Sequence, residues 1–369
     1  MMRAASGAPR ERRKRMEPLR IGFIGTTAPH AFMFLETLKL MPETIGRIAL
    51  VESDMARIDK ASCEFVYSTY EDMLYAERPQ LCFIMLQADE VEDPALRCAE
   101  NGVPFVLDKH CARTAESLRR ILDACAQYQV KMATGYMWRY SPIARQLRAW
   151  VAAGMFGRPF CFDMRIATTS AEVRLEDDQF AWLFEKDKSG GGILLWLGCH
   201  YIDLARFVLQ REVMAVSAMT SRLTTAASDV EDVASVSLQL EDGIVGTLHC
   251  AYVMPKGLRD AYDTAFGLWG SEGDATWAPV IGLNPTLRVR SVHGDMARCP
   301  ERTIQYHDTP EPKAYCGTQL AVHFLRDMMI SLVEGRDFVT TGEDALKVLE
   351  ICEAAYQSAQ TGQRVELPR

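Results

Sequence analysis

The chain has 369 residues, enough for two domains that each bury a core of their own. Hydrophobic residues make up 48% of it and charged residues 24%, which is typical of a globular protein. The net charge of −8 argues against a nucleic-acid partner, because phosphate binding needs a concentrated basic surface. No apolar stretch approaches the roughly 20 residues of a membrane span, so we expect no membrane insertion.

The eleven cysteines stand singly along the chain, from Cys63 to Cys352. Because no two of them form a C-x-x-C pair, their spacing indicates neither a zinc cluster nor a redox dithiol. An odd number of isolated cysteines fits a reducing compartment, where each behaves as a small buried hydrophobe. We therefore expect a cytoplasmic protein without a metal site.

Residues 1–18 form an arginine-rich segment with few large apolar side chains. A secretory signal needs an apolar stretch behind its charges, and none follows here. We interpret the segment as a disordered basic tail, or as the product of an early start codon, rather than as a targeting or nucleic-acid-binding arm. Its basic residues include Arg10, Arg12, Arg13, Lys14 and Arg15.

From residue 19 to about 137, apolar strands alternate with amphipathic helices. Strands are expected at 21–25, 48–51, 81–86, 103–107 and 130–134. Apolar residues at helical spacing follow His30 and, again, Thr114. Repeated units of this kind predict a doubly wound parallel sheet of the Rossmann type, so we assign residues 19–137 to a dinucleotide-binding domain.

Beyond residue 140 the pattern changes to that of a sheet with one buried face. Apolar and polar residues alternate over 234–240, and Glu241-Asp242-Gly243 predicts a hairpin turn into a strand over 244–252. Another strand is expected to bury Phe160, Phe162, Met164 and Ile166. With helices expected at about 194–210, 316–335 and 343–360, residues 138–369 form an α+β domain with a large, mostly antiparallel sheet.

The turn after the first strand, residues 25–30, keeps only the first glycine of the dinucleotide fingerprint G-x-G-x-x-G. Thr27 stands at the second glycine position, where its hydroxyl can bind phosphate while its Cβ holds the phosphate further out. Glu52, at the end of the second strand, is placed to accept hydrogen bonds from a ribose 2′-hydroxyl, which favours NAD over NADP. Arg57 lies close enough in sequence to leave NADP open. A plain βα turn with a solvated glutamate is the alternative.

Asp108-Lys109-His110 follow the strand expected at 103–107. Ligands of open parallel sheets bind beyond the carboxyl ends of the strands. Lys109 is therefore placed to polarise a hydroxyl or to donate to an alkoxide. A plain surface lysine is the alternative.

The helix expected at 194–210 follows the glycine run 190–192 and carries Trp196, His200 and Asp203. Trp196 and His200 are four residues apart and share one face of a helix. An imidazole that titrates near neutral pH is able to take a proton from a hydroxyl, although a core or capping histidine is the alternative. The glycine run favours a functional site, because it allows a ligand or another stretch of backbone to approach closely.

Taken together, residues 19–368 resemble the Gfo/Idh/MocA family of oxidoreductases. Asp108-Lys109-His110 stands where the family has Glu-Lys-Pro, and residues 135–142 (GYMWRYSP) are similar to its interdomain segment. Residues 190–203 (GGGILLWLGCHYID) are similar to its G-G-G-x-x-x-D-x-G-x-H-x-x-D helix, and Glu231-Asp232 with the hairpin that follows and the tail at 342–367 match its closing elements. The resemblance implies NAD(P)-dependent oxidation of a sugar or polyol hydroxyl, with Lys109 and His200 at the reacting carbon.

The resemblance also divides the remaining candidates between cofactor and substrate. NAD is the expected cofactor, with NADP left open. Cofactor contacts are expected from Gly25, Thr26, Thr27, His30, Glu52, Leu86, Asp108, Lys109 and Arg139. Substrate contacts are expected from Tyr136, Trp196, Asp203 and His110, of which Tyr136 and His110 are also weaker candidates for the general base.

The sequence departs from the family pattern at several points. Trp196 replaces the aspartate that the family often pairs with its histidine, and His110 replaces a proline whose peptide bond is usually cis and helps to aim the lysine. The glycine turn is depleted, and residues 89–92 (DEVE) stand where a histidine is expected. Trp196 is able to stack on the apolar face of a sugar ring, with packing in the domain core as the alternative.

The sequence therefore predicts an NAD-dependent dehydrogenase that oxidises a secondary hydroxyl of a sugar, glycoside or cyclic polyol. Lys109 would stabilise the alkoxide, and His200 would act as general base. Two other classes stay open: a redox-neutral, NAD-containing lyase or glycosidase-like enzyme that works through a keto-sugar, and a non-catalytic nucleotide or sugar sensor. By resemblance, the open face of the second sheet forms a homodimer or homotetramer.

Overall fold

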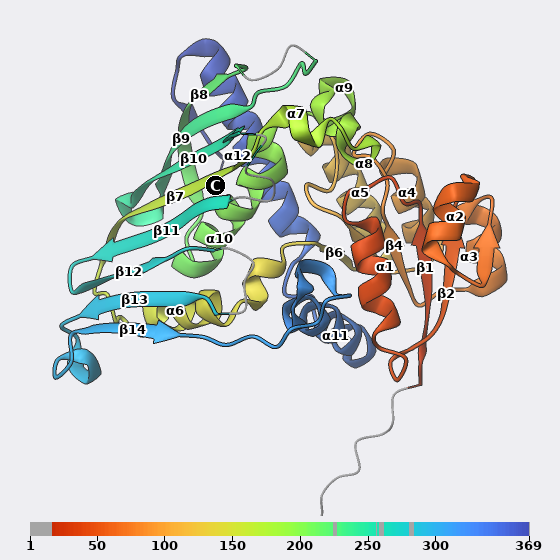
Figure 1. The fold of residues 1–369 in the computed structure, drawn as a ribbon, viewed down its shortest axis with the longest axis horizontal. Helices are drawn as coiled ribbons and strands as arrows, with labels where there is room; N and C mark the ends of the chain where they lie inside the picture. The colour runs from red at the N-terminus through yellow and green to blue at the C-terminus, as the bar shows by residue number, and fades with distance from the viewer. Residues whose placement is uncertain (1–16, 224–226, 256, 258–261, 280–283, 369) are drawn as a thin grey trace, which may run out of the picture.

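The structure is a computed structural model that describes residues 17–223, 227–255, 257, 262–279 and 284–368. The arginine-rich tail expected at 1–18 lies outside these residues, except for its last two positions. The chain forms two β-sheets, one on each side of the view in Figure 1. Two C-terminal helices, α11 (Gln319–Glu334) and α12 (Gly342–Thr361), lie between the sheets.

The first sheet has six strands in the order β3-β2-β1-β4-β5-β6, and all of them are parallel. This is the order of a doubly wound dinucleotide-binding sheet, in which the direction of winding reverses between β1 and β4. The Rossmann-type prediction is confirmed. The strands are β1 (Leu19–Ile24), β2 (Ile45–Val51), β3 (Phe65–Tyr67), β4 (Leu81–Ile84), β5 (Phe105–Leu107) and β6 (Met132–Thr134). The helices are α1 (Ala31–Lys39), α2 (Met55–Ala61), α3 (Tyr70–Glu77), α4 (Glu92–Glu100) and α5 (Ala115–Tyr128).

Burial explains why the apolar runs form the central strands of this sheet. All residues of β4 and β5 are buried, as expected of strands covered on both faces. Thr114 caps α5 by accepting the N–H of Ser117, where the sequence predicts the helix to begin. The ring centroids of Phe34 in α1 and Phe324 in α11 are 6.4 Å apart, and both residues belong to one buried cluster. α11 belongs to the C-terminal part of the chain, yet it packs against a helix of the first sheet. The domain boundary expected at 137–138 therefore stays a prediction.

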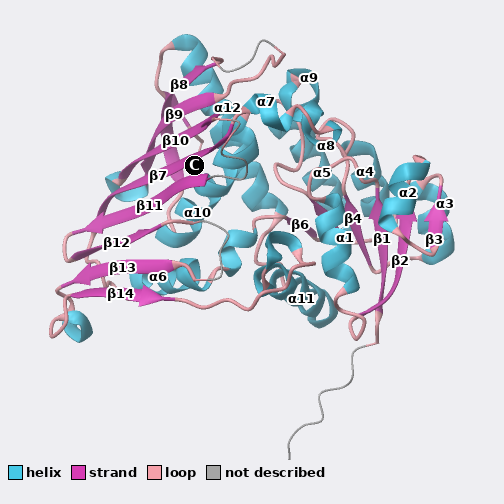
Figure 2. Ribbon diagram, in the orientation of Figure 1, coloured by secondary structure: helices cyan, strands magenta, loops and turns pink. Residues whose placement is uncertain are grey.

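The second sheet has nine strands in the order β14-β13-β12-β11-β7-β10-β9-β8-β15. Only β7 and β10 pair in parallel, so the expected large, mostly antiparallel sheet is confirmed. The helices α6 (Pro142–Ala152), α10 (Cys199–Leu209) and α12 lie against one face of this sheet (Figure 2). The strands alternate buried residues with exposed ones. The strands are β7 (Pro159–Thr169), β8 (Val213–Ser221), β9 (Val233–Leu240), β10 (Val245–Met254), β11 (Tyr262–Gly270), β12 (Gly273–Trp277), β13 (Thr286–Ser291), β14 (Glu301–Gln305) and β15 (Val365–Glu366).

Shorter elements connect the two sheets and carry much of the candidate site. The α-helices are α6 (Pro142–Ala152), α7 (Ala171–Arg174), α8 (Asp178–Ala181), α9 (Lys186–Ser189) and α10 (Cys199–Leu209). The tighter turns are η1 (Met137–Tyr140), η2 (Trp182–Phe184), η4 (Glu241–Gly243), η5 (Gly294–Met296) and η6 (Tyr315–Gly317). A π-helical turn, η3 (Leu194–Gly198), leads directly into α10.

Three details differ from the expectations. Phe160 is 52% exposed rather than buried, because it lies at the start of β7, where pairing with β11 shifts register; Phe162, Met164 and Ile166 are buried as predicted. The helix expected at 194–210 begins with the π-helical turn, in which hydrogen bonds join residues five apart instead of four apart. The segment Lys186–Leu209 is apolar and long enough to pass as a membrane span by composition alone, although 89% of its apolar window is buried inside the molecule.

A carboxylate from the second sheet holds the N-terminal end of the helix that carries Trp196 and His200. Glu231, just before β9, accepts the N–H of Gly192 at 2.8 Å, the N–H of Leu194 at 3.0 Å and the hydroxyl of Tyr356 at 2.9 Å. A Cβ on Gly192 would collide with the Glu231 backbone, and one on Gly191 would collide with the Tyr356 ring. The glycine run therefore serves the close approach of protein groups, which fixes the start of the helix.

We expect Glu231→Ala to lower the free energy of unfolding by about 3 kcal/mol, because two helix N–H groups and a phenol lose their acceptor. Tyr356→Phe removes a single donor and should cost about 1 kcal/mol. Urea denaturation followed by circular dichroism measures both changes. Equal stability of Glu231→Ala and the wild type would contradict this role of the carboxylate.

Candidate active site

The turn that follows β1 lies at the carboxyl edge of the first sheet. Gly25 has a φ of +74°, and a Cβ there would collide with the side chain of Leu86, which follows β4. The Thr26 hydroxyl donates to Glu52 Oε2 at 2.5 Å, and the N–H of Ser53 donates to Glu52 Oε1 at 2.9 Å. The structure therefore brings together Gly25, Thr26, Leu86 and Glu52, four of the residues predicted to contact the cofactor.

Side chains from the second part of the chain cover this turn. Gln179 Nε2 donates to two carbonyl oxygens of the turn, both at 2.7 Å, and Trp182 Nε1 donates to the carbonyl oxygen of Thr27 at 3.1 Å. Arg57 Nη1 donates to Gln179 Oε1 at 3.1 Å. Residues 178–184 are thus tied directly to the turn that is expected to hold the pyrophosphate.

Lys109 follows β5 and is only 3% exposed. Its Nζ donates to the backbone oxygen of Trp196 at 2.7 Å and lies over the indole ring of the same residue. The peptide bond between Lys109 and His110 is cis. Burial lowers the pKa of Lys109 to about 7, and the charge of Arg174 acts in the same direction. Lys109 lines a small cavity at the strand ends, next to Asp108 and Trp182.

His30 and Asp108, both predicted to contact the cofactor, form a buried pair. His30 Nδ1 lies 2.8 Å from Asp108 Oδ2, and the imidazole stacks on Trp196 with a centroid distance of 5.0 Å and an angle of 12°. Burial lowers the pKa of His30, while the carboxylate of Asp108 acts in the opposite direction. Asp108 thus orients the ring of His30 against Trp196, on the wall of a larger cavity.

This larger cavity, which we call the aromatic cavity, has a volume of about 540 Å³. It lies between α1, the η3–α10 helix and the strands β7 and β11, and both Trp196 and His200 line it. Its rings belong to Trp138, Phe180, Trp196, Tyr201, Tyr262 and Tyr315. The volume suits a small organic ligand, and the rings offer apolar faces to it.

His200 is 8% exposed and packs edge-to-face against Tyr136, with ring centroids 5.9 Å apart. Its Nδ1 is enclosed and has no hydrogen-bond partner among the described residues. Burial lowers the pKa of His200 well below its usual value, and Lys109 and His30 add to this effect. At neutral pH, His200 is therefore an uncharged imidazole, which is the form that accepts a proton.

The two weaker candidates for the base lie outside the aromatic cavity. His110 Nε2 lies 2.8 Å from the backbone oxygen of Ser189, and burial lowers the pKa of His110 to about 4. Burial raises the pKa of Tyr136 well above its usual value, so this phenol keeps its proton at neutral pH. Neither residue lines the cavity that His200 lines.

Arg139 and Asp203, predicted to contact cofactor and substrate respectively, bind each other instead. Arg139 Nη2 lies 2.6 Å from Asp203 Oδ1, and Arg139 Nη1 lies 2.8 Å from Asp344 Oδ2. Asp203 is 1% exposed and does not line the aromatic cavity. The structure therefore keeps both residues apart from the other site candidates, in an ion-pair network that joins η1, α10 and α12.

Several enclosed polar atoms without a hydrogen-bond partner gather around the strand ends and the aromatic cavity. In the part of the chain that the structure describes, they include Thr27 Oγ1, His110 Nδ1, Tyr136 Oη, Arg174 Nε, Trp196 Nε1 and His200 Nδ1. Buried polar groups are normally paired, so such a concentration marks a place where a ligand completes the structure. Thr27 Oγ1 lies in the turn expected to bind pyrophosphate, and the residues at the strand ends therefore fit a dinucleotide.

Sequence reasoning missed several residues of the site. Arg174, Tyr262 and Tyr315 line the aromatic cavity from elements far apart in the chain, and no local sequence pattern predicts their position there. Gln179 and Trp182 could have been suspected only from their position shortly before the glycine run. Their contacts with the turn depend on how the second sheet packs against the first.

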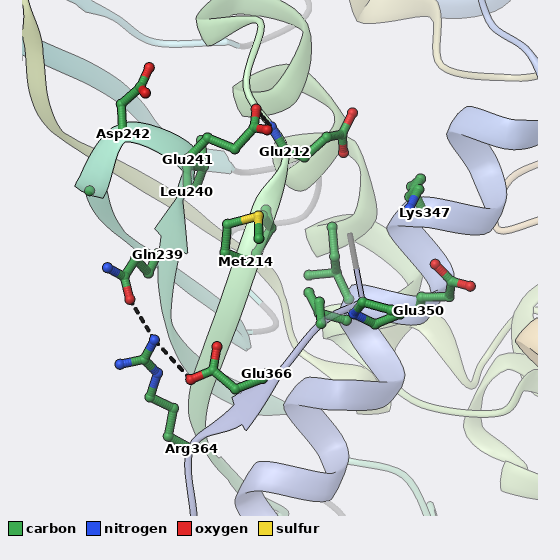
Figure 3. Close-up of a pocket in the computed structure, with 15 residues that line it drawn as sticks. Glu212, Met214, Gln239, Leu240, Glu241, Asp242, Lys347, Glu350, Arg364 and Glu366 are labelled. Atoms are coloured by element: carbon green, nitrogen blue, oxygen red, sulfur yellow. Dashed lines mark hydrogen bonds and ion pairs between the residues drawn. The ribbon is translucent and has the colours of Figure 1, made fainter.

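A second cavity, of about 580 Å³, lies between β8, β15 and α12 (Figure 3). Its acidic residues are largely engaged: Glu212 pairs with Arg206, and Glu366 pairs with Arg364. None of the predicted site residues lines it. Among the described residues, no group of three or more His, Cys, Asp or Glu side chains is placed to hold a metal ion. We therefore place the candidate site at the strand ends and the aromatic cavity.

Comparison with known proteins shows which families and folds this chain resembles. Residues 144–276 match the family model of the GFO/IDH/MocA C-terminal domain. A D-apiose dehydrogenase of Paraburkholderia graminis is 26% identical over 356 residues, which cover 94% of this chain and 88% of the relative. The resemblance to the Gfo/Idh/MocA family expected from the sequence is confirmed. Another relative, D-glucoside 3-dehydrogenase of Escherichia coli, is 23% identical over 373 residues, which cover 95% of this chain and 98% of the relative.

Solved structures share the fold of this chain over almost its whole length. Levoglucosan dehydrogenase in complex with NADH and levoglucosan has a TM-score of 0.81 at 19% identity, covering 96% of this chain and 100% of the other. An oxidoreductase from Agrobacterium radiobacter in complex with NAD+, L-tartaric acid and magnesium has a TM-score of 0.79 at 20% identity, covering 95% and 98%. These likenesses support the arrangement of the two sheets.

We expect the ε-methylene group of Lys109 to titrate with a pKa of about 7 in NMR spectra of protein labelled with ¹³C-lysine. Lysines in solution titrate near 10.4, so between these pH values the unfolded chain binds a proton that the folded chain does not. Stability should therefore rise as pH increases across this window. The Lys109→Met variant should lack both the resonance and this part of the pH dependence.

A Lys109 resonance that titrates together with those of exposed lysines would contradict the prediction. Lys131 provides the internal comparison, because it is exposed and donates to the Gly335 carbonyl group at the surface.

Proposed function

We propose that this chain is an NAD-dependent dehydrogenase that oxidises a secondary hydroxyl of a sugar, glycoside or cyclic polyol, with NADP as the alternative cofactor. Its relatives include dehydrogenases and reductases named for apiose, glucosides, inositol and 1,5-anhydrofructose. The observation that carries the proposal is a buried amine at the end of β5. Lys109 there contacts the helix segment whose Trp196 and His200 line the aromatic cavity.

When bound, the dinucleotide supplies the nicotinamide ring that accepts a hydride from the substrate carbon. The turn at 25–27 would hold its pyrophosphate, with the enclosed hydroxyl of Thr27 as a donor. Glu52 would accept the hydrogen bonds of a ribose. Its carboxylate already accepts the Thr26 hydroxyl, which fixes its orientation toward the turn.

Lys109 and His200 divide the proton chemistry in this proposal. Lys109 Nζ donates to the substrate oxygen and stabilises negative charge on it, an effect that is strong in an enclosed site. His200 accepts the hydroxyl proton at Nε2, because Nδ1 is enclosed by the protein. The rings of the aromatic cavity exclude water and stack on the carbohydrate, with Trp196 nearest to Lys109.

We also propose that the protein works in the cytoplasm as a homodimer or homotetramer, assembled through the open face of the second sheet. Apolar side chains are exposed on this sheet at Phe160, Met219 and Val245. Such side chains on a sheet face are suited to an interface between subunits.

We expect Lys109→Met to lower kcat by about 10²–10³-fold with a sugar or polyol that the wild type oxidises, because the alkoxide loses its main donor. NADH formation, followed by absorbance over a panel of polyols and glycosides, measures the loss. Lys131→Met, a change at the surface, should leave the rate unchanged.

Full activity of Lys109→Met would remove this lysine from the mechanism. Turnover of a glycoside without net release of NADH, together with NAD that copurifies with the protein, would show that the enzyme is redox-neutral and not a dehydrogenase.

We expect His200→Asn to lower kcat by about 10²–10⁴-fold, because the proton of the hydroxyl loses its acceptor. The thermal midpoint and the Kd for NAD should change little, since His200 lies on the substrate side. His249→Asn is the matched control, because His249 is exposed on β10 and bonded only to Ser235. Equal rates for the two variants would show that another group takes the proton.

A further inference from the structure

The aromatic cavity contains a guanidinium group that no described lining residue opposes with a negative charge. Arg174, at the end of α7, is the one described lining residue that carries a permanent charge, and none of the described lining residues is Asp or Glu. Cavities that bind neutral sugars through hydroxyl groups have no need of an uncompensated cation. The charge of this cavity is therefore a feature that a neutral substrate leaves unexplained.

The existing contacts of Arg174 leave its hydrogen-bonding capacity largely unused. Nη2 lies 3.3 Å from Thr168 Oγ1 and 3.4 Å from the hydroxyl of Tyr262, both at the long end for a hydrogen bond. Nε is enclosed and has no partner among the described residues. Apart from these, the guanidinium faces the rings of Phe180 and Tyr252, at 5.9 Å and 5.2 Å. These rings hold the group in place without neutralising it.

Two arginines that are buried more deeply than the half-buried Arg174 are paired with carboxylates. Arg139 is paired with Asp203 and Asp344, and Arg206 is paired with Glu212. Removing a guanidinium group from water without pairing it with an anion costs free energy. Arg174 is half-buried and its Nε is enclosed, so a bound anion would offset this cost. No described carboxylate forms an ion pair with Arg174.

The charge of Arg174 acts on two titratable groups near the aromatic cavity. Lys109 and His30 both lie close enough to Arg174 for its charge to lower their pKa values, in addition to the larger effect of burial. The nearest carboxylate at the strand ends, Asp108, is already bound to His30. An anion entering the cavity therefore meets the guanidinium of Arg174 and, among the described lining residues, no carboxylate.

We propose that the substrate is an anionic sugar or polyol, whose carboxylate or phosphate binds Arg174 while its ring lies among the aromatic side chains. The proposal rests on the proposed dehydrogenase function and names its substrate class. A guanidinium fork binds either anion through two parallel hydrogen bonds, one from Nε and one from a terminal nitrogen. The hydroxyl of Tyr262 is placed to donate a further bond to the same group. The cavity volume of about 540 Å³ is adequate for a monosaccharide.

The test compares aldoses with their uronates and 6-phosphates in the gluco, galacto and manno series. Isothermal titration calorimetry in the presence of NAD measures binding to the wild type, Arg174→Met, Arg174→Lys and Arg165→Met. Arg165 is a matched control, because it lies exposed on β7 and pairs with Asp263 outside the cavity. NADH formation is followed in parallel with each compound.

We expect at least one uronate or 6-phosphate to bind the wild type about 10–100-fold more tightly than its neutral aldose. Arg174→Met should remove this preference and leave the affinity for the neutral aldose unchanged, Arg174→Lys should retain part of it, and Arg165→Met should behave as the wild type. A preference within the anions identifies the group: tighter uronates indicate a carboxylate, and tighter 6-phosphates a phosphate.

Three results would overturn the proposal: neutral aldoses that bind as tightly as every anion, a loss in Arg174→Met that is equal for neutral and anionic ligands, or no binding of any anionic sugar. Formation of NADH from neutral sugars without preference would reject the anionic substrate and keep the dehydrogenase. Binding of anions that depends on Arg174 but yields no NADH would reject the dehydrogenase and keep the anion site.

Discussion

The relation between the two sheets depends on one buried ion-pair network centred on Arg139. Its guanidinium bonds to Asp203 on α10 and to Asp344 at the start of α12, and it also donates to the backbone oxygen of Val339. Three segments far apart in the chain therefore meet at one planar group. Because an enclosed charge that loses a partner is strongly unfavourable, this network fixes how α10 and α12 meet η1. Both η1 and α10 carry residues that line the aromatic cavity.

The carboxylates around the candidate site bind other protein groups and do not line the aromatic cavity. Asp203 and Asp344 hold Arg139, Glu231 holds the start of the π-helical turn, and Asp108 orients His30. What remains for a ligand is a set of cations, uncharged imidazoles and aromatic rings. Burial keeps Lys109 and the histidines close to their neutral forms, so their chemistry depends on the absence of nearby negative charge as much as on their own identity.

Much of the fold was predictable, because strongly apolar strands and long amphipathic helices carry clear periodicity. β3 has only three residues, none of them fully buried, and α2 buries only Ala61, so neither leaves such a signal. Motifs located Lys109, Trp196 and His200, since those residues stand in local patterns. The resemblance to the family placed Asp203, one turn beyond His200, among the expected substrate contacts. Its partner Arg139 lies 64 residues away, and no local pattern reports such a contact.

The short helix α8 places two adjacent side chains in different spaces. Gln179 bonds to the backbone of the turn after β1, and Phe180 lines the aromatic cavity beneath the guanidinium of Arg174. A molecule that displaces or tightens one of these contacts acts on the other through a single peptide unit. Binding equilibria coupled in this way obey thermodynamic reciprocity: the factor by which the first ligand changes the affinity for the second is returned unchanged in the opposite direction.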